Sequence, residues 1–253
     1  MNITVWNECH PSTKSGKTAK IYPDGIHVAI KDIFAGDEIL KVRTVLQEEP
    51  ENGLTDTVLS ETDVLIWWGH VWQNNVLDSV SDKVCKRILG GMGAIFLHSA
   101  YASKPFTRLM GTSCTLKWRD IEEKERVWTV NPSHAIVSGI PETFSLEPEI
   151  MYGEFFDIPT PDELILLGWY PGGELIRAGC TFRRGYGKVF YFQPGHESCP
   201  TFYNENVKRL IYNATLWAAP QGTIKNQIQP IQSGKPAEPV EIQKKKGIFK
   251  KYF

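Results

Sequence analysis

The first hundred residues alternate between two hydrophobic patterns. Short apolar or alternating runs predict β-strands at 3–6, 40–46, 64–68 and 94–97. Apolar residues at helical spacing predict helices at 26–34 and 76–89, and Gly90-Gly91 ends the second one. The third and fourth strands are apolar throughout, which is typical of parallel strands buried on both faces. This alternation predicts an α/β fold with a doubly wound, mostly parallel sheet of the flavodoxin-like kind and right-handed crossovers.

The second half of the chain carries antiparallel signals. The segments 116–118 and 126–130 flank a charged stretch that predicts a turn, and 163–169 is a further apolar run. Residues 174–182 and 188–192 enclose a Gly-containing segment, which indicates a hairpin. A last helix carries Val207, Leu210, Ile211 and Leu216. We therefore expect antiparallel additions to the parallel sheet.

Charge divides the chain into two parts. The whole chain holds 28 Lys+Arg and 29 Asp+Glu, for a net charge of −1. Residues 220–253 are rich in Gln, Pro and Lys and carry +5, so residues 1–219 carry −6. We expect one α/β domain over 1–219 and a basic tail over 220–253. The tail would dock on a neighbouring subunit of a homo-oligomer; docking on its own body and binding a nucleic acid or membrane are the alternatives.

Composition excludes several classes of protein. Hydrophobic residues make up 42% of the chain, which excludes a wholly disordered protein. The apolar runs are too short to span a bilayer, and no leader pattern opens the sequence, so we expect a cytoplasmic protein without a membrane or nucleic-acid partner. Five scattered Cys form no CxxC pair and are expected to be free thiols.

Histidines mark the ends of predicted strands. His10, His70, His98 and His196 each follow such a strand, whereas His27 and His134 do not and are expected to be structural. Ligands of open α/β sheets bind outside the carboxyl ends of the strands. The four imidazoles are therefore expected to share one pocket.

Two kinds of chemistry fit such a histidine set. Neutral imidazoles bind zinc or another divalent metal, and His70, His98 and His196 are the candidate ligands. Imidazoles also serve as metal-free general acids and bases, because their pKa lies near neutrality. The nearby carboxylates are Glu149, Glu154 and Glu197, and Glu197 would either orient an imidazole or cap the last helix.

Aromatic residues near the same strand ends suggest a sugar ligand. Trp6, Trp67, Trp68 and Trp72 lie there, and Tyr101 and Tyr152 could join them. Sugar rings bind aromatic faces through their apolar C–H patches. Filling of the core is the competing interpretation of these tryptophans.

A class I glutamine amidotransferase would combine this architecture with a Cys nucleophile and a His–Glu pair. The segment Pro194-Gly195-His196-Glu197 looks like the His–Glu half. The required strand-to-helix turn reads Leu97-His98-Ser99, with neither a Cys nor the flanking Gly residues of a nucleophile elbow. Glutamine hydrolysis by that route is therefore excluded, and Ser99 is a poor substitute for the thiol.

Several segments together resemble the trehalose-utilisation (ThuA-like) family over residues 1–219. They are Trp67-Trp68-Gly69-His70, Gly91 to Ser99, Glu149 to Glu154, Arg177-Ala178-Gly179-Cys180 and Gly187 to Glu197. The resemblance implies a glutamine-amidotransferase-like α/β fold without the amidotransferase Cys. It also implies a role in the use of trehalose and related disaccharides, and pocket positions at His98, Glu149, Glu154 and His196.

These observations lead to an expected function. We expect an enzyme of carbohydrate catabolism that acts on trehalose or a 3-keto disaccharide by acid–base or metal-assisted chemistry, with zinc the expected metal and no organic cofactor. His196, oriented by Glu197, would be the base. His98 and His70 would polarise a carbonyl, and Glu149 would return a proton. Trp6, Trp68, Tyr152 and Glu154 would hold the sugar. The alternatives are a non-catalytic sugar-binding or regulatory protein and a simple glycoside hydrolase that uses Glu149 and Glu154.

Overall fold

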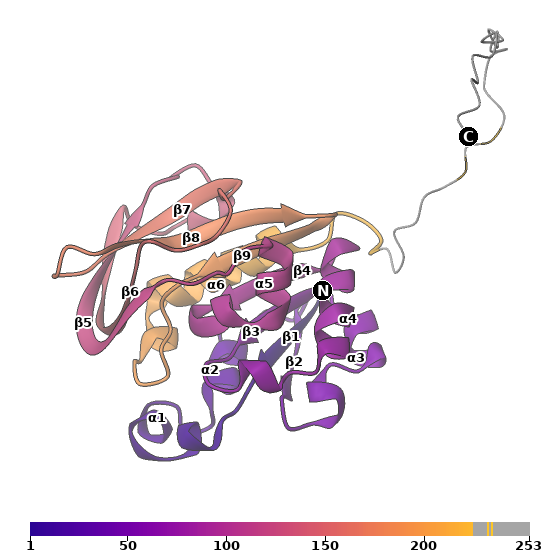
Figure 1. The fold of residues 1–253 in the computed structure, drawn as a ribbon, viewed down its shortest axis with the longest axis horizontal. Coiled ribbons are helices and arrows are strands. Elements are labelled where there is room, and N and C mark those ends of the chain that lie inside the picture. The colour runs from indigo at the N-terminus through magenta and orange to yellow at the C-terminus, as the bar shows by residue number, and fades with distance from the viewer. Residues whose placement is uncertain (225–231, 233, 235–253) are drawn as a thin grey trace, which may run out of the picture.

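The computed structural model of the chain describes residues 1–224, 232 and 234. It contains a nine-stranded sheet with the order β2-β1-β3-β4-β9-β8-β7-β5-β6 (Figure 1). The parallel strands are β1 (Asn2–Asn7), β2 (Lys41–Leu46), β3 (Val64–Trp68), β4 (Gly93–Leu97) and β9 (Gly187–Phe192). The antiparallel strands are β5 (Lys117–Thr129), β6 (Thr143–Gly153), β7 (Glu163–Trp169) and β8 (Leu175–Arg184).

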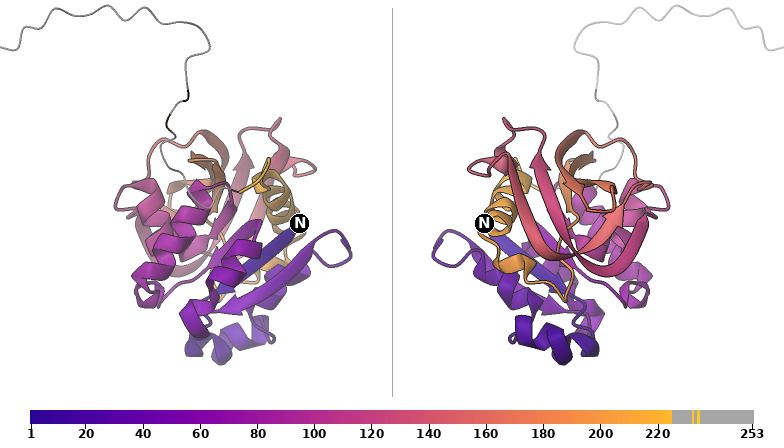
Figure 2. Two further views of the ribbon diagram at one scale, coloured as in Figure 1. Left: turned by 90° about the vertical axis from the view of Figure 1, so that its right-hand side faces the viewer. Right: turned by 90° about the vertical axis from the view of Figure 1, so that its left-hand side faces the viewer.

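The α-helices connect and cover these strands. They are α1 (Gly16–Ile21), α2 (Ile26–Asp32), α3 (Asp56–Glu61), α4 (Asp78–Leu89), α5 (Lys104–Met110) and α6 (Glu205–Ala218). Short 3₁₀ turns include η1 (Pro11–Lys14), η2 (Pro50–Gly53), η3 (Gln73–Asn75), η4 (His98–Ala102), η5 (Ala135–Val137) and η6 (Thr201–Tyr203). Helices α4 and α5 pack on each other, α6 packs on β4 and β9, and Figure 2 shows the sheet between these two groups. No helix of the described residues is long and apolar enough to cross a membrane.

The predicted alternation of strands and helices in the first half is confirmed. Strands β1, β2, β3 and β4 lie at the predicted positions, and α4 ends at Gly90 as expected. Every residue of β3 and β4 is buried, as their unbroken apolar runs indicated. The Gly-containing segment forms the predicted hairpin, in which Arg184 of β8 faces Gly187 of β9.

One prediction for the second half was wrong. The segments 116–118 and 126–130 are not separated by a turn, because Lys117–Thr129 is one strand, β5. Most of its charged residues are exposed along the strand. A run of charged residues is also typical of a loop, which is why the sequence predicted a turn there. The segment Glu149 to Glu154 belongs to β6 as far as Gly153.

Most of the basic tail lies outside the described residues. From residue 225 onward only 232 and 234 are described. The predicted docking of residues 220–253 on a neighbouring subunit therefore stays a prediction.

Candidate functional site

Three histidines meet at the carboxyl edge of the parallel strands. His70 follows β3, His98 follows β4 and His196 follows β9, and these strands are neighbours in the sheet. The ring centres of His70 and His196 are 5.0 Å apart, and that of His98 is 6.2 Å from His70 and 5.3 Å from His196. The strand-end pattern therefore predicted this cluster.

His10 does not join the cluster. Its Nδ1 accepts a hydrogen bond from the Ser12 backbone N–H (3.2 Å) and so caps η1, and its ring contacts the edge of Trp72. The chain turns away at Pro11, which starts η1 immediately after His10. The expectation that four imidazoles gather at this edge is therefore corrected, since His10 lies apart from the other three.

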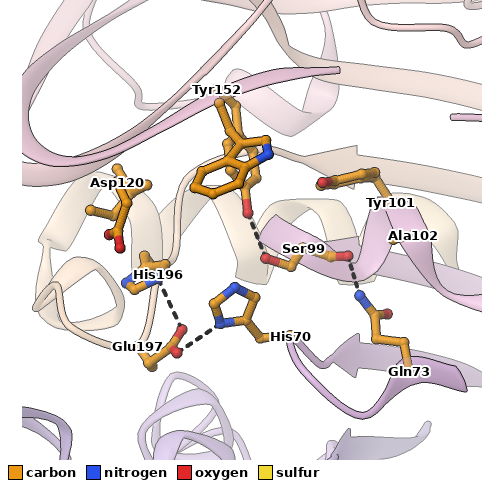
Figure 3. A pocket seen from close by; sticks show the side chains of 11 residues that line it. His70, Gln73, Ser99, Tyr101, Ala102, Asp120, Tyr152, His196 and Glu197 are labelled. Atoms are coloured by element: carbon orange, nitrogen blue, oxygen red, sulfur yellow. Dashed lines mark hydrogen bonds and ion pairs between the residues drawn. The ribbon is translucent and has the colours of Figure 1, made fainter. Parts of the chain in front are cut away.

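A cavity of about 420 Å³ opens beside the cluster (Figure 3). Its lining residues are His70, Gln73, Ser99, Tyr101, Ala102, Trp118, Asp120, Ile150, Tyr152, His196 and Glu197. This volume lies in the range of small-molecule sites. The mixture of imidazoles, carboxylates, hydroxyls and aromatic rings suits a polar ligand with an apolar face.

Glu197 connects the two histidines that line the cavity. Its Oε1 is 2.7 Å from His70 Nδ1, and its Oε2 is 3.4 Å from His196 Nε2. The backbone amide of Ser198 and its Oγ lie 3.1 Å and 2.9 Å from His196 Nδ1. Glu197 therefore orients His70 more closely than His196, which differs from the predicted pairing.

This connection gives the two imidazoles different proton affinities. Burial disfavours a charged His70, but the hydrogen bond and charge of Glu197 outweigh it and raise the pKa of His70. Burial lowers the pKa of His196, against the weaker attraction of Glu197. Burial would raise the pKa of Glu197, yet the hydrogen bond and charge of His70 lower it.

His98 and Glu149 lie behind the cavity and do not line it. Both are fully buried, and the His98 ring stacks under Tyr152 with centres 4.5 Å apart. His98 Nδ1 is 2.8 Å from Gln193 O, and burial, followed by the charges of His196 and His70, lowers the pKa of His98 well below its usual range. The predicted direct catalytic roles of these two residues are therefore corrected, since neither can touch a ligand in the cavity.

Glu149 instead holds the turn that carries His196. Its carboxylate accepts hydrogen bonds from four groups: Ile150 N (3.0 Å), Gly195 N (2.9 Å), His196 N (3.2 Å) and Thr201 Oγ1 (2.6 Å). Burial raises the pKa of Glu149, and these donors oppose that effect.

Of the predicted sugar-binding residues, one lines the cavity and others are buried in the core. Tyr152 lines the cavity, where its hydroxyl lies 2.6 Å from Ser99 Oγ. Trp6 and Trp68 belong to the core and are fully buried; Trp6 stacks on Trp67, and the Trp68 indole donates to Gly195 O. Their expected role as a sugar platform is therefore wrong.

Glu154 lies outside the cavity lining. It sits beyond the end of β6 and binds Arg177 Nε at 2.8 Å, in a separate groove. The glycosidase alternative, which pairs Glu149 with Glu154, loses support because Glu149 is sealed in the core.

The sequence interpretation missed several residues of the site. Trp118 and Asp120 enter the cavity from β5, and Gln73 enters from η3. Trp118 belongs to the predicted segment 116–118, whereas Asp120 lies in the stretch predicted as a turn. Buried Glu8 accepts hydrogen bonds from the backbone of Val71 and Trp72 and so fixes the loop after His70. Its position directly after β1 obeys the same strand-end rule that identified the histidines.

The residues that could hold a metal ion also differ from the prediction. His70, His196 and Glu197 each offer a ligand atom, and these atoms lie within 4.8 Å of one another. His98, predicted as a third ligand, is absent from this group, and Glu197 takes its place.

Comparisons with known proteins agree with the fold. A ThuA-like protein from Parabacteroides merdae ATCC 43184 has a TM-score of 0.65 at 14% identity, covering 90% of this chain and 92% of that one. A ThuA-like protein from Bacteroides uniformis ATCC 8492 has a TM-score of 0.63 at 15% identity, covering 86% and 91%. A β-galactosidase from Bacillus circulans sp. alkalophilus has a TM-score of 0.55 at 14% identity, covering 86% of this chain and 31% of that one.

At these identities the solved structures establish the α/β fold and its large mixed sheet, and nothing more. No curated protein matches the chain. The family model described as trehalose utilisation matches residues 3–218, which is most of the sequence. The chain therefore belongs to the trehalose-utilisation (ThuA) family.

Proposed function

We propose that the chain is an enzyme of carbohydrate catabolism that acts on trehalose or a related 3-keto disaccharide by acid–base chemistry. Family membership implies a role in trehalose utilisation. The observation that carries the enzymatic proposal is the contact of one carboxylate, Glu197, with two cavity-lining imidazoles, His70 and His196.

The two imidazoles divide the proton transfers between them. A 3-keto group acidifies the neighbouring C–H, so a base can remove that proton and a nearby acid can stabilise the resulting oxyanion. His196, whose pKa is lowered, is neutral, and its Nδ1 accepts the backbone N–H of Ser198, so its ring proton lies on Nε2 on the side of Glu197. It acts as the base at Nε2 after this proton moves to Nδ1. His70 is paired with Glu197 and donates a hydrogen bond to the oxyanion. Opposed pKa shifts in one cavity are typical of such acid–base pairs.

The experiment is turnover of 3-keto-trehalose by the purified chain, followed by chromatography of the products. We expect His70→Ala, His196→Ala and Glu197→Gln each to lose at least about tenfold in rate, as general acid–base groups do. His10→Ala is the matched control because His10 lies outside the cavity. Full turnover by the His196→Ala variant would refute the assignment. Tight binding of the sugar without product on long incubation would favour the binding-protein alternative.

The same three residues support a metal-assisted form of the proposal. Two imidazoles and a carboxylate form the donor set of many catalytic zinc sites, and such an ion acts as a Lewis acid. His70, His196 and Glu197 would hold it. Elemental analysis of the purified protein tests this: we expect about one zinc per chain in the wild type and a loss of metal in His196→Ala. Less than about a tenth of an equivalent, without exposure to chelators, would contradict the metal-assisted form.

A further inference from the structure

Strand β5 is irregular where it passes the cavity. Its register with β6 shifts between Arg119, which faces Met151, and Glu122, which faces Ile150. Asp120 and Ile121 therefore form a bulge. Bulges re-aim side chains and are frequent beside active sites. Here Trp118 and Asp120, next to and within the bulge, both line the cavity.

Ion pairs brace the backbone on both sides of the bulge. Arg119 binds Glu123 (Nε to Oε1, 2.6 Å) and Glu174 (Nη1 to Oε1, 2.7 Å), and Lys17 of α1 binds Glu122. Planar, two-sided contacts of a guanidinium with carboxylates are geometrically specific. The bulge is therefore held in place before any ligand arrives.

The two cavity-facing side chains of this segment are free for a ligand. Trp118 is the most exposed tryptophan of the chain, with 65% of its surface accessible. The exposed carboxylate of Asp120 has no hydrogen-bond or ion-pair partner among the described residues. Its charge acts on His70 and His196, and Figure 3 shows it above His196. An open indole face beside an unused acceptor matches a sugar ring, whose C–H patch is apolar and whose hydroxyls donate.

We propose that Trp118 and Asp120 form the substrate-holding wall of the site, where one sugar ring of the disaccharide stacks on the indole and donates hydroxyl hydrogen bonds to the carboxylate. This inference rests on the proposed function and deepens it, because the wall would place that ring against His70 and His196.

Calorimetry and tryptophan fluorescence with trehalose test the wall. We expect the dissociation constant to rise about tenfold in Trp118→Ala and in Asp120→Asn, through loss of stacking and of a charged acceptor. Trp118→Phe keeps an aromatic face and should bind within about threefold of the wild type. Stacking also removes water from the indole, so trehalose should shift the wild-type emission to the blue. That shift should vanish in Trp118→Phe although the sugar still binds.

Two controls are matched to these variants. Trp128→Ala alters an exposed tryptophan of the same strand, and Asp24→Asn alters an exposed aspartate of a turn; neither residue lines the cavity. Both should bind trehalose as the wild type does. If the wild type binds trehalose and Trp118→Ala and Asp120→Asn bind it equally well, the wall is overturned and the proposed function stands. If the wild type neither binds trehalose nor consumes 3-keto-trehalose, the proposed function fails and the wall fails with it.

Discussion

Replacing Glu149 by glutamine tests what this buried carboxylate does. Two effects compete in its environment. Burial alone disfavours the charge, so a neutral side chain of the same shape would be tolerated or even stabilising. Four donors within 3.2 Å favour the carboxylate, because each must otherwise find another acceptor. If Glu149 mainly serves to hold these four donors in place, the loss of hydrogen bonds outweighs the gain from removing the charge, and Glu149→Gln lowers the free energy of unfolding.

The contacts give the size of the effect. A glutamine keeps one oxygen, but its NH₂ group must face two of the four donors. Placed at the Oε2 position, it meets the Thr201 hydroxyl, which can turn and accept, and the Gly195 N–H, which cannot. A buried backbone donor left without a partner, together with the loss of a charged acceptor, costs about 2–4 kcal/mol. For a chain of this size that corresponds to a fall of about 2–4 °C in Tm per kcal/mol.

Urea denaturation at pH 7, followed by circular dichroism, measures this loss. Thr201→Val removes a single donor and should cost about 1 kcal/mol, which is less than Glu149→Gln. Glu142→Gln is the control, since Glu142 is an exposed residue just before β6. A free energy of unfolding for Glu149→Gln at or above that of the wild type would show that burial, and not hydrogen bonding, governs this position.

Three further predictions concern the surroundings of the site. Gly195→Ala should lower the free energy of unfolding by more than about 1 kcal/mol, because Gly195 has φ 132 and a Cβ would lie 2.7 Å from the Phe202 ring; denaturation midpoints equal to the wild type would contradict this. Burial raises the pKa of Glu125 well above its usual range. The free energy of unfolding of the protein is therefore undiminished at low pH, where Glu125 is protonated in both states, and it falls as pH rises from the unfolded-state pKa of Glu125 towards the folded-state pKa. Glu125→Gln should therefore gain stability over the wild type at pH 8 but not at pH 4, by about 1.4 kcal/mol for each pKa unit of the shift, and an equal difference at both pH values would refute the reasoning. Ser99→Ala should still turn over 3-keto-trehalose, because Ser99 Oγ bonds to the Tyr152 hydroxyl and to no imidazole; a complete loss of turnover without unfolding would instead favour a nucleophilic serine.

The sequence predicted the three histidines that gather, but it wrongly added His10 and did not show how deep each one lies. Parallel strands end at one edge of a sheet, so His70, His98 and His196 had to come together once β3, β4 and β9 proved to be neighbours. Depth depends on the turn that follows each strand. His98 takes a left-handed conformation with φ 51, and its ring packs beneath Tyr152. A pattern of apolar and polar positions carries no information about such a turn.

The tryptophans show how a correct strand prediction can coexist with a wrong site prediction. In strands that are buried on both faces, no side chain is accessible to a ligand, and Trp6 and Trp68 lie within such strands. The tryptophan that reaches the cavity, Trp118, belongs to a strand whose charged residues resemble a loop. Its position depends on a bulge and on ion pairs with residues distant in the sequence, so local pattern could not reveal it.

One carboxylate explains why two histidines on the same edge come to differ. Burial lowers the proton affinity of both His70 and His196, so a site without Glu197 would hold two similar neutral imidazoles. Glu197 follows His196 in the same turn, and a residue is poorly placed to bond closely to its own neighbour's ring. It therefore reaches 2.7 Å to His70 on the adjoining loop and only 3.4 Å to His196. The order of the strands brings those two loops together, and the difference in distance gives the two imidazoles the opposed pKa shifts on which the proposed acid–base roles rest.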